Sequence, residues 1–311
     1  MRRWRAIVKA TILEMSSEPL ALLLTLSSIA IIAFASVFHI HQFGGADSSR
    51  MARDAGFSVL LVIGIAYAVF CTVKVFRREI ESGTAQMALA HPVSRAGFFV
   101  AKASGAFLAY AVFALTVFGV TVTTVVGAKA GGIVARRTGD IAFIWGPALA
   151  IDAAVAVLPL VLAAVADRFF RCRFTTAATW LSLAISLLGA AASIALAVAF
   201  GFGDGMIGVP LWLAPAAVML LFPAAVFVAA SAAFSVRVKE GVATALAGAL
   251  FMVALPAFGN YYLSSALSKG ATIPWSRVLP PASPRSRSSL RLGCWAFIFS
   301  TRGIYHEFRS G

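Results

Sequence analysis

The sequence predicts an all-α fold: a polytopic bundle of about seven or eight transmembrane helices, preceded by an N-terminal interfacial amphipathic helix. Of the 311 residues, 60% are hydrophobic and only 12% are charged, whereas a soluble domain has about 25% charged residues. Apolar runs near the roughly 20 residues needed to cross a bilayer recur along the chain. The basic residues, which set the net charge of +14, gather between alternate runs. This composition excludes an ordinary soluble enzyme, a disordered chain and a collagen-like fibre.

Residues 1–19 are expected to form the interfacial helix. Trp4, Ile7, Ile12 and Met15 fall on one face at helical spacing, and the opposite face is basic. Such a helix lies in the membrane plane with its tryptophan at headgroup depth. The alternative is an unstructured basic leader. The polar residues assigned to this helix are Arg2, Arg3, Arg5, Lys9 and Glu14, and Trp4 is its anchor.

Residues 20–275 are expected to form the transmembrane domain. Its predicted spans are 20–38, 57–76, 98–126, 146–166, 174–200, 210–234 and a shorter one at 242–258. A further run at 290–300 is only about half the length that a span requires.

The distribution of basic residues predicts the orientation of the chain. If every span crosses and the N-terminus is cytoplasmic, 14 of the 19 Lys and Arg residues before residue 260 lie on the cytoplasmic side. Cytoplasmic loops of membrane proteins carry such an excess. The high net charge therefore reflects topology, and we expect no nucleic-acid partner.

The C-terminal segment, 276–311, differs from the rest of the chain. Residues 276–291 are rich in Pro, Ser and Arg, whereas the preceding text is dominated by Ala, Val, Leu and Phe. One interpretation is an exposed, irregular basic loop. The other is a reading-frame error that replaced most of a last span, and resequencing of the gene would decide between them.

The chain lacks the residues that other membrane functions need. Among the acidic residues, only Asp152 lies within an apolar span, about one and a half turns from its outer end. Ion-coupled carriers, in contrast, usually have carboxylates along the ion path. There is no G-x-x-x-x-G-K-[ST] motif for ATP. The three cysteines are far apart, and His39 and His41 have no third ligand nearby, which favours an interfacial pair over a metal site. Energy for active transport would therefore come from a partner protein on the cytoplasmic side.

The loop between the second and third spans, about 77–95, is the most distinctive segment of the sequence. It carries both charge signs, and Ile80, Thr84 and Met87 have the spacing of a short amphipathic helix. Pro92 would end that helix, and Ser94 would cap the next one. A short charged helix joined to two membrane helices can transmit movement from a soluble partner into the bilayer. The alternative is a solvated loop.

This loop resembles the signature of ABC-type-2 permease subunits. The matching text is REIESGT at 78–84, LAHPVSR at 89–95, Phe99, and Lys102 followed three residues later by Gly105. A weaker match covers Thr11 to Glu14, and others lie at 255–275. The branch most resembled contains the nitrous-oxide-reductase maturation and gliding-motility permeases. The resemblance ends after Trp275, where relatives would continue into a full apolar helix.

The resemblance implies a membrane-spanning subunit of an ATP-driven exporter in the bacterial cytoplasmic (inner) membrane. It implies an ABC ATPase subunit in trans, which would bind ATP and Mg²⁺, and a second permease copy, identical or different. This chain would bind no cofactor or metal and would have no catalytic residue. The alternative is an assembly or scaffold protein without transport activity. The residues implied to contact the ATPase are Arg77, Arg78, Glu79, Glu81, Gly83, Thr84, Pro92, Ser94 and Arg95.

Overall fold

The computed structural model describes residues 2–42, 48–81, 95–138, 146–170, 173–202 and 204–237. Within these ranges all regular secondary structure is helical, which confirms the predicted all-α class. The expected seventh span, the doubtful eighth and the segment 276–311 lie outside the described residues. The helices are α1 (Arg2–Ser16), α2 (Pro19–Gln42), α3 (Ser48–Glu81), α5 (Arg95–Thr138), α6 (Gly146–Phe170), α7 (Phe174–Ala199) and α8 (Val209–Arg237), with the 3₁₀ turn η1 (Asp204–Met206) before α8.

Each of the first six predicted spans coincides with a helix. Five helices, namely α3, α5, α6, α7 and α8, are long and apolar enough to cross a membrane, and the pair α1 and α2 passes the same test together. By length and composition, the described residues therefore hold five candidate spans, or six if the bent pair is one span. A total of seven or eight stays a prediction, because the remaining candidates lie beyond residue 237.

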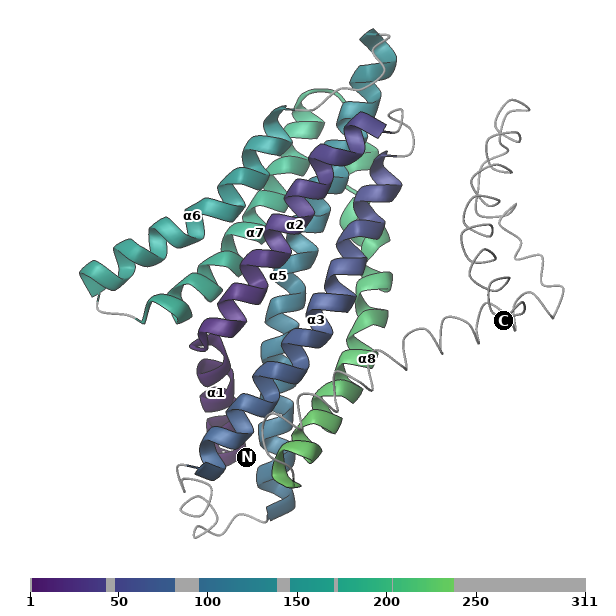
Figure 1. Cartoon of the computed structure of the whole chain (residues 1–311). Coiled ribbons are helices and arrows are strands. Elements are labelled where there is room, and N and C mark those ends of the chain that lie inside the picture. Colours follow the sequence, from purple (N-terminus) through teal and green to yellow (C-terminus); the bar gives the residue numbers. More distant parts are fainter. Residues whose placement is uncertain are drawn as a thin grey trace, which may run out of the picture. The chain divides into compact units, whose positions relative to one another are not determined.

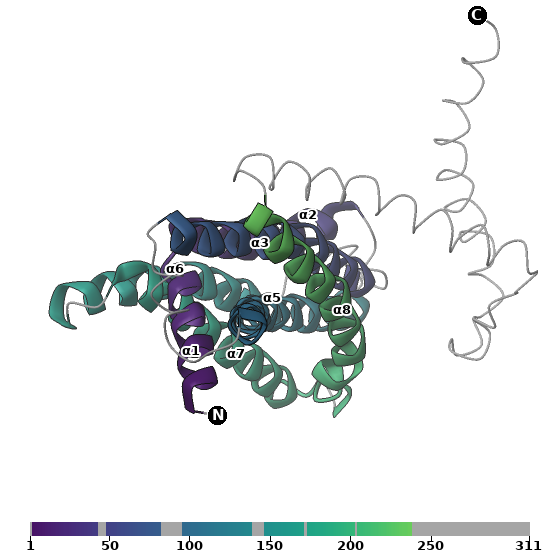
Figure 2. The ribbon, with the colours of Figure 1, turned by 90° about the horizontal axis from the view of Figure 1, so that it is seen from below.

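Helix α5 occupies the centre of the bundle. It contacts each of the other described α-helices, and the end-on view shows it surrounded by them (Figure 2). Helices α6 and α7 form an antiparallel hairpin beside it, while α3 packs against α5 and α8 (Figure 1). Any displacement of α5 must therefore be accommodated by the other described α-helices.

The core is formed by aromatic and small side chains of α3 and α5. The Tyr67 and Phe113 rings stack at a centroid distance of 4.6 Å, and both side chains are buried. Further along α5, a Cβ on Gly119 would lie 3.0 Å from the backbone of Ser186 in α7. The absence of a side chain there allows the two backbones to approach closely, as is common between membrane helices.

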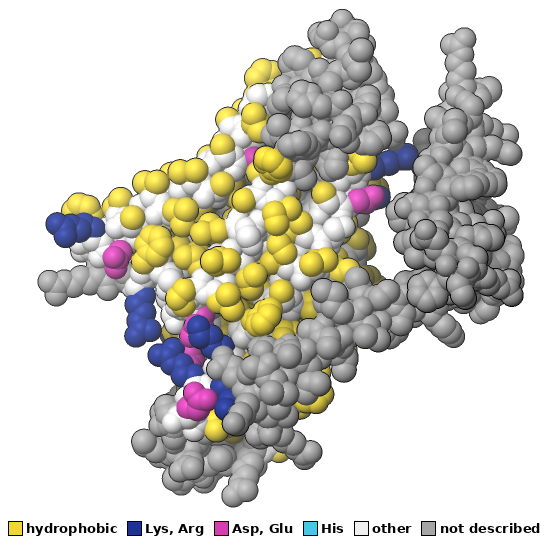
Figure 3. Space-filling model, viewed as in Figure 1, with side chains coloured by type: hydrophobic (Ala, Val, Ile, Leu, Met, Phe, Trp, Pro, Cys, Tyr) yellow, Lys and Arg dark blue, Asp and Glu magenta, His cyan; other side chains and the backbone are white. Residues whose placement is uncertain are grey.

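Large apolar side chains remain exposed on the outer faces of the helices. On α8, Leu211 and Val226 are 81% and 67% exposed, and on α6 Val157 is 57% exposed. Hydrophobic side chains cover the middle of the described surface, whereas many charged ones gather toward the end that carries α1 (Figure 3). Because soluble monomers rarely expose apolar patches of this extent, the surface is suited to contact with lipid.

Helix α1 lies within residues 1–19, where the interfacial amphipathic helix is predicted, and bends sharply into α2. Helix α1 ends at Ser16, and α2 leaves it at an angle of 64°. Thr11 and Met15 of α1 are buried, whereas Trp4 is 42% exposed. The helix is thus tied to the bundle along one side. Its position in the membrane interface stays a prediction.

Candidate functional site

The residues predicted to contact a partner ATPase fall at the end of α3 and just beyond it. Arg77, Arg78, Glu79 and Glu81 belong to the last turns of α3, and Arg95 begins α5. The side chains of Glu79 and Arg95 are not described. Gly83, Thr84, Pro92 and Ser94, with most of the predicted short helix, lie outside the described residues.

Glu81 and Arg77 contact each other on the same helix. Their side chains form an i,i+4 ion pair at 3.2 Å, in which Glu81 remains 61% exposed and Arg77 is 20% exposed. Such a pair adds a few tenths of a kcal/mol to a helix. The carboxylate of Glu81 is therefore only weakly held and largely exposed to solvent.

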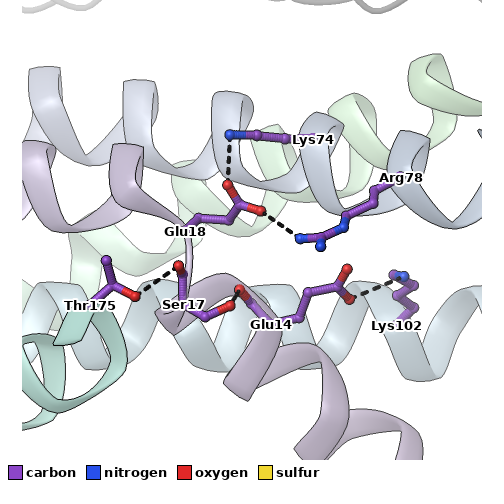
Figure 4. Close-up of polar contacts among 7 residues, drawn as sticks. All are labelled: Glu14, Ser17, Glu18, Lys74, Arg78, Lys102 and Thr175. Carbon is purple, nitrogen blue, oxygen red and sulfur yellow. Dashed lines mark hydrogen bonds and ion pairs between the residues drawn. The ribbon is translucent and has the colours of Figure 1, made fainter. Parts of the chain in front are cut away.

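Glu18, at the break between α1 and α2, is the centre of a charged junction. Its side chain is 6% exposed, and its two oxygens lie 2.6 Å from Lys74 Nζ and 3.3 Å from Arg78 Nη1 (Figure 4). A buried carboxylate is costly unless it is paired and hydrogen-bonded. The two cations of α3 satisfy this requirement, and the bend is thereby fixed to the predicted coupling end of α3.

Helix α7 holds the same bend from another side. Thr175 Oγ1 donates a hydrogen bond to the Ser17 carbonyl at 2.9 Å. Thr179 Oγ1 shares its hydrogen between the Thr175 carbonyl of its own helix, at 2.8 Å, and the Ser16 carbonyl, at 3.2 Å. The last carbonyls of a helix lack partners within the helix. The two threonines supply them, so the end of α1 is anchored to α7 as well as to α3.

A third attachment joins α1 to α5. Glu14 Oε2 lies 3.8 Å from Lys102 Nζ, and a Cβ on Gly105 would lie 2.8 Å from Thr11 Cβ and 3.1 Å from the Val8 carbonyl oxygen. Thr11 and Glu14 are three residues apart, as are Lys102 and Gly105, so each pair lies on one face of its helix. The two fragments that resemble the family, Thr11 to Glu14 and Lys102 to Gly105, thus contact each other between α1 and α5.

Lys102 is the most buried charge of this junction. Its side chain is 1% exposed, and its Nζ also lies 5.4 Å from the centroid of the Phe76 ring on α3. A cation over an aromatic face is attracted by the ring, more strongly when it is shielded from water. Lys102 therefore contributes to the contact of α5 with both α1 and α3.

We expect Glu14→Gln to destabilise the protein more than Lys102→Met. Glu14 is 24% exposed and can regain water when Lys102 is replaced, whereas Glu14→Gln removes a counter-charge from a buried ammonium. The expected cost of Glu14→Gln is about 1–3 kcal/mol. Thermal unfolding in detergent measures it, and the double variant should lose less than the sum of the singles. Equal, additive losses would contradict the pairing.

Of the other residues assigned to the N-terminal helix, Trp4, Arg5 and Lys9 are exposed along α1. The side chains of Arg2 and Arg3 are not described.

Elsewhere, the one carboxylate predicted to lie inside a span is buried. Asp152 in α6 is 2% exposed, and its Oδ1 has no hydrogen-bond partner within the described part of the chain. In the same part of the chain, no three His, Cys, Asp or Glu side chains are grouped as a metal site requires. His39 and His41 lie in α2, but their side chains are not described.

Sequence reasoning missed the centre of the junction. Glu18 was not singled out as a site residue, nor were Lys74 and Thr175. Two local signals concern Glu18 and Lys74: Glu18 directly precedes Pro19 at a helix start, and Lys74 lies one turn before Arg78. Neither signal says that Glu18 and Lys74 form an ion pair, and no local signal marks Thr175, whose hydroxyl contacts the neighbouring Ser17 carbonyl.

A family model described as "ABC-2 family transporter protein" matches residues 17–178. This stretch runs from the break after α1 to the first turns of α7 and includes Glu18, Lys74, Lys102 and Thr175. Comparisons with curated proteins and with solved structures found no match. The matched residues make up more than half of the chain, which is therefore a multi-pass membrane protein that belongs to the ABC-2 transporter family.

Proposed function

We propose that this chain is the permease subunit of an ATP-driven exporter, coupled to a separate ATPase through the segment 77–95. The observation that supports the proposal best is the charged junction. The end of α3 is joined to the α1–α2 bend by Glu18, and that bend is joined to α5 and α7. A force applied at the end of α3 would therefore reach the other helices of the bundle through direct contacts.

The partner ATPase would bind ATP and Mg²⁺, since the sequence carries no Walker A motif. Its closure would move the segment after Glu81, and α3 and α5, which flank that segment, would transmit the movement. ABC-2 permeases work with an ABC ATPase and form dimers, so a second permease copy, identical or different, would complete the transporter. The proposed location is the bacterial cytoplasmic (inner) membrane, with the N-terminus in the cytoplasm. The branch that contains the nitrous-oxide-reductase maturation and gliding-motility permeases remains the proposed affiliation.

Co-purification with the product of an adjacent ATPase gene tests this proposal. We expect the wild-type chain to bind the ATPase in detergent, and Glu79→Ala with Glu81→Ala to weaken assembly or coupled hydrolysis about tenfold, as loss of a charge-assisted contact does. The control is Asp54→Ala, which removes an exposed carboxylate near the opposite end of α3.

Two outcomes would count against the proposal. If the double variant and the control behave alike, the carboxylates at the end of α3 do not couple the two subunits. If no ATPase binds the wild-type chain, the experiment is repeated with a complete apolar helix in place of residues 276–311. Failure of that version as well would favour the scaffold alternative.

A further inference from the structure

A pocket of ≈ 630 Å³ lies beside the charged junction. It is lined by residues of the α1–α2 bend, of the last turns of α3 and of the start of α7, namely Ser17, Glu18, Pro19, Lys74, Arg78, Glu81 and Arg173. Only two of its three cations take part in the pairing with Glu18. The charge balance of the lining therefore indicates what could occupy it.

The lining carries an excess of positive charge. The lining has three cations against two carboxylates, Glu18 and Glu81, and Glu81 also has Arg77, which is not in the lining, at 3.2 Å. Arg173 forms no ion pair with the described residues, and its side chain does not cap α7. The first amide groups of α7, at the positive end of the helix dipole, add to the field. The pocket therefore suits an anionic group.

Exposed apolar side chains lie one helical turn from two of the lining residues. Pro19 lies one turn before Leu23 on α2, and Lys74 lies one turn after Phe70 on α3. Leu23 is 60% exposed and Phe70 is 42% exposed, and residues four apart share a face of a helix. A ligand that fits both parts has an anionic head at the pocket and apolar chains along α2 and α3.

We propose that this pocket binds the phosphate headgroup of an anionic phospholipid, with Arg173 and the unbalanced charge of Lys74 and Arg78 as its contacts. The acyl chains lie along the lipid-facing surface at Leu23 and Phe70. Phosphate oxygens accept several short hydrogen bonds from arginine, and the predicted cytoplasmic leaflet is the one rich in anionic lipids. A lipid bound here joins α3 to α7 across the bend, and its binding requires no ATPase.

Native mass spectrometry of the purified full-length chain in detergent tests the proposal without an ATPase. The probes are phosphatidylglycerol and phosphatidylcholine with the same acyl chains. We expect phosphatidylglycerol to bind the wild type more tightly, and Arg173→Ala to weaken it about tenfold. Arg173→Lys should restore part of the affinity. The matched control is Arg168→Ala, because Arg168 is exposed on α6 and does not line the pocket.

Soluble anions distinguish a lipid site from a free phosphate site. Inorganic phosphate and glycerol phosphate should bind much more weakly than phosphatidylglycerol. Equal affinities for glycerol phosphate and the lipid would overturn the proposal, as would equal binding of the two lipids or equal effects of Arg173→Ala and Arg168→Ala.

A measurement on the wild type alone guards against misfolded variants. Phosphatidylglycerol should raise the thermal unfolding midpoint, and phosphatidylcholine at the same concentration should not. Equal shifts would contradict the proposal. Since none of these readouts involves ATP, failure of the lipid site and failure of the proposed ATPase coupling remain distinguishable.

Discussion

Glu18→Gln is expected to destabilise the helical bundle by about 1–3 kcal/mol. The substitution keeps the shape of the side chain but removes the charge that Lys74 and Arg78 share. Breaking a buried ion pair costs about 3–5 kcal/mol, and the expected cost is lower here because the two cations are 43% and 61% exposed and can return to water. Thermal unfolding in detergent measures the stability, and coupled ATP hydrolysis measures the function.

Asp54→Asn is the matched control for this prediction. It also neutralises one carboxylate of an ion pair with an α3 arginine, at 2.7 Å from Arg53, but that carboxylate is 63% exposed. Exposed pairs contribute about 0–1 kcal/mol, so the control should remain close to wild type. If Asp54→Asn lowered the free energy of unfolding as much as Glu18→Gln does, the burial of Glu18 at the bend would not explain the destabilisation. Normal coupling in a stable Glu18→Gln variant would remove the junction from the proposed mechanism.

Gly105→Val should separate α1 from α5 and cost about 1–3 kcal/mol, the usual effect of overpacking. A Cβ at this position would already lie 3.1 Å from the Val8 carbonyl oxygen, and a backbone atom cannot move aside as a side chain can. The branched valine adds two methyl groups to that contact. We expect a lower unfolding midpoint, faster proteolysis within residues 2–16, and loss of coupling to an ATPase.

Gly146→Val provides the comparison, because no heavy atom lies within 4 Å of a Cβ built there. Both variants make the same chemical change. Gly105 lies inside α5, where valine has a higher helix propensity than glycine, whereas Gly146 begins α6, so a larger loss in Gly105→Val reports the contact with α1. Similar proteolysis in the two variants would contradict the close packing of α1 on α5.

The positions of the described helices were largely predictable because lipid imposes a simple rule. A span must be helical and apolar for about 20 residues, and the runs at 146–166 and 174–200 differ from α6 and α7 by only a few residues. The extensions of α3 and α5 beyond their apolar runs were not predicted. A charged, glycine-containing segment such as 127–138 is compatible with a loop and also with a helix that extends beyond the membrane, so its sequence alone did not predict the extension of α5.

The junction was much less predictable than the helices. Its contacts join residues far apart in the sequence, such as Glu18 with Arg78 and Ser17 with Thr175. Hydrophobic periodicity orients each helix but does not say which helices are neighbours. The resemblance did single out Thr11, Glu14, Lys102 and Gly105, yet only the structure shows that these residues face one another. The predicted contacts of Glu79 and Glu81 with an ATPase stay predictions.

The length of α5 has a mechanical consequence. Its 44 residues, at 1.5 Å per residue, form a rod of about 66 Å, whereas the bilayer with its headgroups is about 40–45 Å thick. Each degree of tilt about one end therefore displaces the other end by about 1 Å. Near its start the rod is attached to α1, and farther along Gly127 packs against Ala148 at the start of α6. A small rotation of α5 about its attachment to α1 would therefore produce a larger displacement at the far end of the helix.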